Sequence, residues 1–154
     1  MPKQPSTPTI RTAHPGDLDS LTRLLQSLFA IEEDFTFNEA LQRRGLQQLL
    51  DKPTAKIMVA DIDGEAVGMC SGQITISTAE GGPSLLLEDL VVSEEHRGRG
   101  LGKQLTESLE LWAHGNGVSR LQLLADRHNG AALDFYKKLG WQGTQLICLR
   151  KRLP

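Results

Sequence analysis

A stretch rich in arginine and glycine, reading RGRGLG from Arg97 to Gly102, is the part of the sequence best suited to bind an anion. An apolar run precedes it and a pattern with helical spacing follows it, so it lies where a strand turns into a helix. The first N–H groups of a helix have no partner within the helix, and glycine lets the main chain approach a ligand closely. Arginine and lysine add charge for phosphate oxygens. We therefore expect phosphate binding by Arg97, Gly98, Arg99, Gly100, Leu101, Gly102 and Lys103.

Two common phosphate motifs do not match this stretch. A P-loop requires a glycine five positions before its Gly-Lys pair and a Ser or Thr after it, but here Arg97 and Gln104 occupy those positions. In a dinucleotide fingerprint that starts at Gly98, the third glycine position holds Lys103. The alternative without a ligand is a solvated, flexible helix start.

Two neighbouring carboxylates, Glu88 and Asp89, are the only charges within the apolar run Ser84–Ser93. An unpaired carboxylate is costly to bury, so such residues have a partner or a function. Adjacent residues of a strand face opposite sides, so only one of the two faces a cleft unless a bulge intervenes. The structural alternative for Glu88 is pairing with a buried arginine or capping a loop.

The patterns of hydrophobic residues predict the elements that must position these groups. Leucines at helical spacing from Leu18 to Leu28 predict a first helix, and Asp63-Gly64 between two apolar runs predicts a hairpin. The other expected elements are strands at Thr9–His14, Ser84–Ser93, Ser119–Asp126 and Trp141–Leu153, and helices at Asn38–Leu50, Leu101–His114 and Ala131–Leu139. This order predicts a three-layer α/β domain with a mixed sheet over residues 9–154, after a disordered lead-in at residues 1–8.

The composition is that of an ordinary globular domain. The chain has 154 residues, 39% hydrophobic and 23% charged, with a formal net charge of −2. There is no basic excess to favour nucleic acid, and no apolar run approaches the roughly 18 residues of a membrane span. We expect a cytoplasmic protein, no membrane association, buried free thiols at Cys70 and Cys148, and no metal site.

Two motifs together resemble one enzyme family. The stretch Arg97–Gly102 is similar to R/Q-x-x-G-x-G/A, the acetyl-coenzyme A motif of the GNAT superfamily of N-acetyltransferases. The stretch Asn129–Trp141, NGAALDFYKKLGW, is similar to that family's N-x-x-A-x-x-F-Y-x-x-x-G-F/W. The order of the elements around both motifs also fits. The resemblance implies a GNAT-like fold, with helices on both faces of a mixed central sheet and a splay between two central parallel strands.

The resemblance also implies roles for matching positions. Main-chain amides across Arg97–Lys103 would hold the pyrophosphate of acetyl-coenzyme A. Main-chain groups of Leu90, Val91 and Val92 would pair with its pantetheine arm, as a strand adds to a sheet edge. Asn129 would lie beside the arm and Tyr136 near its sulfur, with the tyrosine hydroxyl as the candidate general acid.

The stretch LEDLVV resembles the same stretch in polyamine N-acetyltransferases, and this implies that Glu88 is the base, acting directly or through water. Asp89 is then expected to have a structural role. The acidic residues Glu32, Glu33 and Asp34 would suit a cationic acceptor, although a solvated loop explains them equally well.

These interpretations predict an N-acetyltransferase that transfers an acetyl group from acetyl-coenzyme A to a primary amine on a small cationic molecule, in a ternary complex. The alternative is a non-catalytic module that binds acyl-coenzyme A as a sensor or scaffold. It would need neither Glu88 nor Tyr136. We also expect a homodimer.

Overall fold

The computed structural model describes residues 2, 6–32 and 34–154, in two compact units, Met1–Leu123 and Leu124–Pro154, each of which is treated by itself. The expected lead-in at residues 1–8 falls partly outside the described residues. The first unit holds β1 (Thr9–Thr12), η1 (Pro15–Asp17), α1 (Leu18–Ile31), α2 (Glu39–Asp51), β2 (Ala55–Ile62), β3 (Glu65–Ser77), β4 (Gly82–Val92), η2 (Glu94–His96), α3 (Leu101–Gly115) and β5 (Arg120–Leu123). The second unit holds α4 (Gly130–Lys138).

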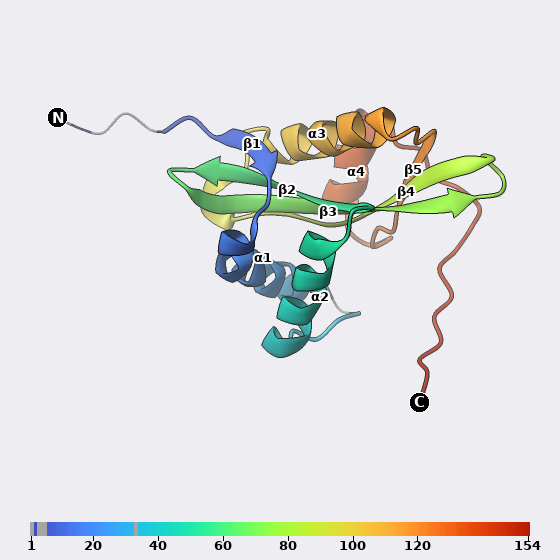
Figure 1. Ribbon diagram of the computed structural model, residues 1–154, viewed down its shortest axis with the longest axis horizontal. Coiled ribbons are helices and arrows are strands. Elements are labelled where there is room, and N and C mark those ends of the chain that lie inside the picture. Colours follow the sequence, from blue (N-terminus) through green and yellow to red (C-terminus); the bar gives the residue numbers. More distant parts are fainter. Residues whose placement is uncertain (1, 3–5, 33) are drawn as a thin grey trace. The chain divides into compact units, whose positions relative to one another are not determined.

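The first unit is built on a five-stranded sheet in the order β1-β2-β3-β4-β5. The first three pairings are antiparallel, and β4 and β5 are parallel. A parallel pair needs a crossover connection, and α3 supplies it. In Figure 1, α1 and α2 lie against one face of the sheet and α3 against the other. This arrangement confirms the predicted three-layer fold with a mixed sheet.

Side chains from the sheet and the helices close both faces. The leucine stripe of α1 and Leu46 of α2 pack on strand residues in a buried cluster of Leu21, Leu24, Leu25, Leu46, Ile57, Val59, Ala66, Met69 and Val91. On the α3 side, Leu109 is fully buried and lies close over β3 at Gly72. A Cβ at Gly72 would come within 2.9 Å of Leu85 and 3.0 Å of Leu109, so this close approach requires glycine.

The predicted hairpin and helices are confirmed within a few residues. Asp63 and Gly64 both have positive φ, 53° and 86°, as the tight β2–β3 turn requires. Asn38 caps α2 by accepting a hydrogen bond from the Leu41 N–H at 3.2 Å. The strand expected at Ser119–Asp126 is shorter, because β5 ends at Leu123.

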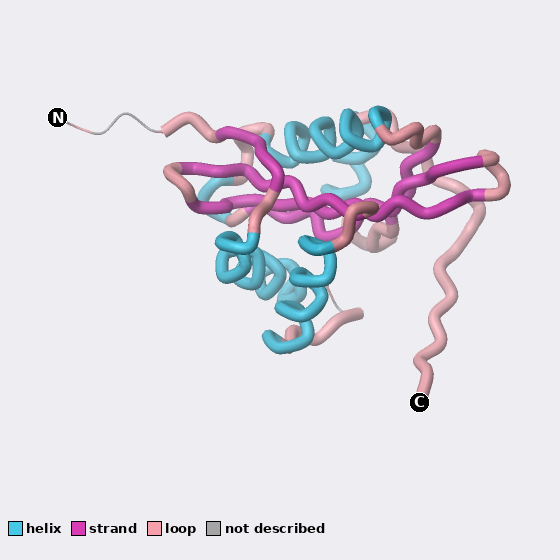
Figure 2. Tube along the Cα trace, viewed as in Figure 1, coloured by secondary structure: helices cyan, strands magenta, loops and turns pink. Residues whose placement is uncertain are grey.

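The predicted C-terminal strand at Trp141–Leu153 is wrong. Residues 141–154 contain no strand, and Figure 2 draws them as loop. Alternation of apolar and polar residues makes a strand only where a neighbouring strand takes up its main-chain groups. Four large apolar side chains here are 70–87% exposed: Leu146, Ile147, Leu149 and Leu153.

An ion-pair network joins β1, η1 and β2 beside the core. Asp17 is 3% exposed and accepts two hydrogen bonds from the Arg11 guanidinium, at 2.8 and 2.9 Å. The Nε of Arg11 also donates to Asp61 at 2.7 Å. Burial raises the pKa of Asp17, but its hydrogen bonds to Arg11 and to the His14 N–H outweigh burial, so the pKa is lowered. Asp17 is also the N-cap residue of α1, but its side chain makes no cap hydrogen bond to that helix.

Replacing Asp17 by Asn will destabilise the fold by about 2 kcal/mol, because it removes a charged hydrogen bond between Arg11 and the buried carboxylate, while Arg11 keeps its bond to Asp61. Urea denaturation measures the loss. Because the pKa of Asp17 is lowered, the stabilisation is present above the unfolded pKa of aspartate and is lost as pH falls through the folded value. The two proteins should therefore converge in acid.

The control for this variant is Glu65→Gln, which removes the exposed ion pair between Arg23 and Glu65. Exposed pairs contribute little, so the free energy of unfolding should barely change. An equal loss in both variants would contradict the account.

Candidate active site

The corner between β4 and α3 is built from a short 3-10 turn and two glycines in the left-handed region. The turn η2 follows β4 directly, and φ is 77° at Gly98 and 76° at Gly100. Gly100 is the N-cap of α3 and, having no side chain, caps none of the helix N–H groups. The sequence therefore folds here into an uncapped helix start with an exposed main chain.

The main-chain N–H donors of this corner are open to a ligand. From Gly98 to Lys103, no N–H donates to another residue in the part of the chain that the structure describes. The first helical hydrogen bond is made by the Gln104 N–H to the Gly100 carbonyl, at 3.1 Å. Unpaired donors at the positive end of a helix fit a diphosphate, so the corner can hold the pyrophosphate of a coenzyme.

Two of the three charged side chains of the corner interact with other parts of the protein. The Nε of Arg97 donates to the Val92 carbonyl at 3.1 Å, so this side chain ties the corner to the end of β4. Lys103 lies 3.8 Å from Glu107 one helical turn along α3. Arg99 is exposed at the corner.

The ladder between the parallel strands β4 and β5 ends just before the corner. Their ladder runs from Ser84–Arg120 to Leu87–Leu123 and ends there. Within the first unit, Glu88–Val92 has no partner on this side, while β3 pairs with the other side of β4. This is the predicted splay. An extended amide-containing group can pair with such an open edge.

Leu90, Val91 and Val92 lie along this open stretch. The side chain of Val91 is buried in the core cluster under α1, whereas Leu90 and Val92 are half-buried. Their proposed contacts with a pantetheine arm involve main-chain groups and so do not conflict with this packing.

A bulge interrupts β4 beside the separation. Met69 pairs with Val91 and Ser71 with Glu88, so Asp89 and Leu90 lie together opposite the single residue Cys70. Asp89 adopts a positive φ of 55°, rare for a residue other than glycine. The simple alternation of sides along the strand therefore does not hold at Glu88 and Asp89.

The bulge turns both carboxylates toward the α1 side of the sheet. Ser71 lies two residues from Met69 on β3, so it shares the face of the core cluster, and Glu88 opposite Ser71 shares that face too. The Ser71 hydroxyl donates to the Glu88 carbonyl at 3.2 Å, and its effect on the Asp89 carboxyl is to lower the pKa. Glu88 itself is exposed.

The Asp89 carboxyl has a strongly perturbed acidity. Burial, with added repulsion from Glu88 and Glu32, raises its pKa to about 7, and the Ser71 hydrogen bond only partly offsets this. A carboxyl that titrates near neutral pH in a strand next to an opening is typical of a functional site.

The structure treats the three acidic residues that follow α1 differently. Glu32 is the C-cap of α1, and its charge acts on Asp89. Asp34 is exposed. Glu33 lies outside the described residues. We name Glu32, Glu88 and Asp89 the carboxylate group; the sequence could not show it, because the bulge and the end of α1 assemble it.

Asn129 and Tyr136 belong to the second unit. The Asn129 side chain caps α4 by accepting from the Ala132 N–H at 3.1 Å. The Tyr136 ring packs edge-on against Phe135 and Trp141, with centroids 5.2 and 5.9 Å apart. Glu88 and Tyr136 fall in different units, so their juxtaposition stays a prediction.

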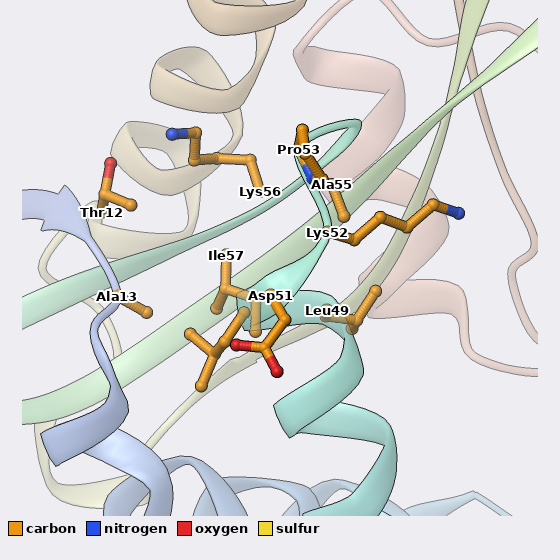
Figure 3. A pocket seen from close by; sticks show the side chains of 10 residues that line it. Thr12, Ala13, Leu49, Asp51, Lys52, Pro53, Ala55, Lys56 and Ile57 are labelled. Carbon is orange, nitrogen blue, oxygen red and sulfur yellow. The ribbon is translucent and has the colours of Figure 1, made fainter.

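A hollow of about 230 Å³ lies elsewhere, between β1, the end of α2 and the start of β2. Figure 3 shows Thr12, Lys52 and Lys56 among the side chains around it. It includes none of the residues that the sequence singled out.

The two cysteines differ, contrary to the expectation that both are buried. Cys70 is buried, which raises the pKa of its thiol to about 12, but Cys148 is exposed. Both are free. Among the described residues, no three His, Cys, Asp or Glu side chains are grouped to hold a metal.

No helix in residues 2, 6–32 and 34–154 is long and apolar enough to cross a bilayer.

Comparisons with known proteins agree with this geometry. Residues 19–141 match the acetyltransferase (GNAT) family. A thialysine N-epsilon-acetyltransferase of Bos taurus is 32% identical over 145 residues, which cover 86% of this chain and 83% of that protein. The chain therefore belongs to the GNAT family of acetyltransferases, as the resemblance implied, and it is an enzyme that uses acetyl-coenzyme A.

Two further comparisons differ in how much of each protein they cover. An uncharacterized N-acetyltransferase of Bacillus subtilis is 32% identical over 101 residues, but the match spans only 39% of that protein. An aminoglycoside N-acetyltransferase solved in complex with coenzyme A aligns with a TM-score of 0.83 over 99% of this chain and 100% of its own, at 21% identity. At that identity the likeness concerns the fold.

Replacing Gly100 by Ala will weaken acetyl-coenzyme A binding about tenfold, because a Cβ disfavours the left-handed backbone that holds the corner open. Isothermal titration calorimetry measures the affinity. Gly64→Ala is the matched control, since Gly64 also has positive φ and open space around it but lies in the β2–β3 turn. Equal affinity losses in both variants would show that the corner has no special role.

Proposed function

We propose that this acetyltransferase transfers the acetyl group of acetyl-coenzyme A to a primary amine on a small cationic molecule, by direct attack in a ternary complex. The observation that carries the proposal is the carboxylate group Glu32, Glu88 and Asp89 at the point where β4 leaves β5. Negative groups beside the open edge favour a positively charged acceptor.

The relatives support the same class of acceptor. The bovine protein is named for thialysine, and the structural neighbour for aminoglycosides. Both names denote compounds that carry amines, and amines are mostly protonated at neutral pH.

The coenzyme would be held by two parts of this chain. The unpaired N–H groups of the corner would bind the pyrophosphate, and the open edge at Leu90–Val92 would pair with the pantetheine arm. When bound, the coenzyme supplies the activated acetyl group. Because Arg97 occupies the Val92 carbonyl, its side chain would have to share or release that acceptor if the arm uses it.

Side chains of this chain would carry out the proton transfers. An ammonium cannot attack until it loses a proton, and we propose that Glu88 takes part in removing it, directly or through water. Tyr136 would donate a proton to the departing thiolate as general acid. Asn129 would lie beside the pantetheine arm, although its amide already caps α4.

Two broader expectations complete the proposal. We propose a homodimer, supported by the exposed apolar side chains between Leu146 and Leu153, which a partner could cover. We propose a cytoplasmic location, supported by two free cysteines, since disulfides are rare in that compartment.

The function is tested by incubating the protein with acetyl-coenzyme A and single amines, including lysine analogues and aminoglycosides. We expect thiol release together with an acetyl mass shift on at least one cationic amine. Tight coenzyme binding without turnover across this panel would instead support the acyl-coenzyme A sensor.

Replacing Tyr136 by Phe will lower kcat about 100-fold and leave the affinity for acetyl-coenzyme A nearly unchanged, because a lost general acid affects the transition state. Steady-state kinetics and calorimetry give the two quantities. Phe135→Leu is a control for loss of aromatic packing in α4. An unchanged kcat in Tyr136→Phe would remove the tyrosine from the acid role.

Replacing Glu88 by Gln will shift the acid limb of the profile of kcat/KM against pH and raise KM for a dicationic acceptor. Both effects follow from removing a negative charge beside the amine. Glu65→Gln, an exposed change on β3, is the control for total charge. A profile identical to that of the unmodified enzyme would contradict a role for Glu88.

A further inference from the structure

Asp89 combines three features that do not occur together at an ordinary strand position. Its backbone is held at a positive φ of 55° within the β4 bulge. Its side chain is half-buried, although the neighbouring Glu88 is exposed. It lies two residues beyond the end of the β4–β5 ladder. Strained non-glycine backbone concentrates where function requires it.

The surroundings of Asp89 favour its neutral form. The charged groups that act on it are Glu88 on its own strand and Glu32 at the end of α1, both negative. The carbonyl end of α1 adds further negative potential. Among the described residues, only the Ser71 hydroxyl of β3 favours ionisation.

The Ser71 hydroxyl helps Asp89 to ionise only partly, because its proton already has an acceptor in the main chain. The hydroxyl has one proton, which is directed to the Glu88 carbonyl at 3.2 Å. An ionised Asp89 would compete with that carbonyl for the same proton.

We propose that Asp89 is the final acceptor of the proton that the substrate ammonium loses, received through Glu88 or a water beside it. The inference rests on the proposed function and adds a residue to it. The step converts R–NH₃⁺ and the Asp89 carboxylate into R–NH₂ and the Asp89 carboxylic acid. The lone pair freed on nitrogen attacks the acetyl carbonyl, and Asp89 later returns its proton to solvent.

The raised pKa makes Asp89 suited to this step. Moving a proton from an amine of pKa near 10 to an ordinary carboxyl of pKa near 4 is unfavourable by about 10⁶-fold. A carboxyl with a pKa of about 7 reduces that factor to about 10³. Glu88 is exposed and can meet the amine first, and the neighbouring Asp89 then holds the proton more tightly than an ordinary carboxyl would.

The pH dependence follows from this acidity. Below about pH 7 Asp89 already holds a proton and cannot accept another, so kcat/KM should fall on the acid side with a midpoint near 7. Stability should show the opposite trend. Because the folded pKa is raised, the stabilising contribution is full below the unfolded pKa and is lost as pH rises through the folded value.

The kinetic test compares Asp89→Asn with the unmodified enzyme on an amine that the enzyme acetylates. Asparagine tolerates positive φ as aspartate does, so the backbone should be retained. We expect kcat/KM at pH 8 to fall about 100-fold and the acid limb to disappear. Glu88→Gln should instead move the limb to lower pH, because the Glu88 charge helps to raise the pKa of Asp89.

Asp63→Asn is the matched control. Asp63 also has positive φ, 53°, but lies in the β2–β3 turn, so its replacement should leave the pH profile unchanged. An acid limb near pH 7 that persists in Asp89→Asn would overturn the proposal.

A second measurement does not need turnover. Carboxyl carbon NMR of the protein without substrate should show one aspartate with a titration midpoint near pH 7 that is missing in Asp89→Asn. A midpoint near 4 for Asp89 would overturn the proposal. Failure of the unmodified enzyme to acetylate any amine would refute the proposed function, and the two refutations are therefore distinguishable.

Thermal unfolding gives a third readout. Asp89→Asn should unfold at a higher temperature than the unmodified protein at pH 8 and lose this advantage at pH 5, because only the ionised aspartate is penalised. A residue with a purely structural role would lower the melting temperature at both pH values. That result would also overturn the proposal.

Discussion

The end of the β4–β5 ladder at Leu87, which leaves the rest of β4 unpaired on that side within the first unit, is the constraint on which the site depends. Main-chain groups of a strand are normally paired, so a strand that leaves its neighbour in the middle of a sheet must be held in place by something else. Here β3 pairs along the other side of β4 up to Val92, and the Val91 side chain is anchored under α1. The edge can therefore stay open without unfolding the strand.

The bulge at Asp89 and Leu90 links this opening to the chemistry. An extra residue on β4 changes which side the following side chains face, so Val91 still packs in the core while Glu88 and Asp89 both turn toward α1. The bulge thus determines both where the unpaired edge of β4 lies and which carboxyl groups lie close enough to raise the pKa of Asp89. The corner at Gly98 and Gly100 follows in sequence, so the groups that hold the coenzyme and the carboxylate group lie on one continuous segment.

The sequence predicted the layers and the phosphate corner because local chemistry determines both. Leucines at helical spacing marked α1, Asp63-Gly64 marked the hairpin, and the glycines at 98 and 100 marked a helix start with open donors. It failed at Trp141–Leu153, where strand formation depends on a partner strand. It could not predict the positive φ of Asp89 or the approach of Glu32, since both arise from register and packing between distant segments.

The central claim is that the coenzyme occupies the corner and the open edge of β4 together. Amide hydrogen exchange with and without coenzyme A tests it directly, because the N–H groups from Gly98 to Lys103 have no partner among the described residues and should exchange fast. Coenzyme A should slow exchange there and at Leu90–Val92 while leaving β1 unchanged. Protection confined to the hollow beside α2, or none at the corner, would contradict the account.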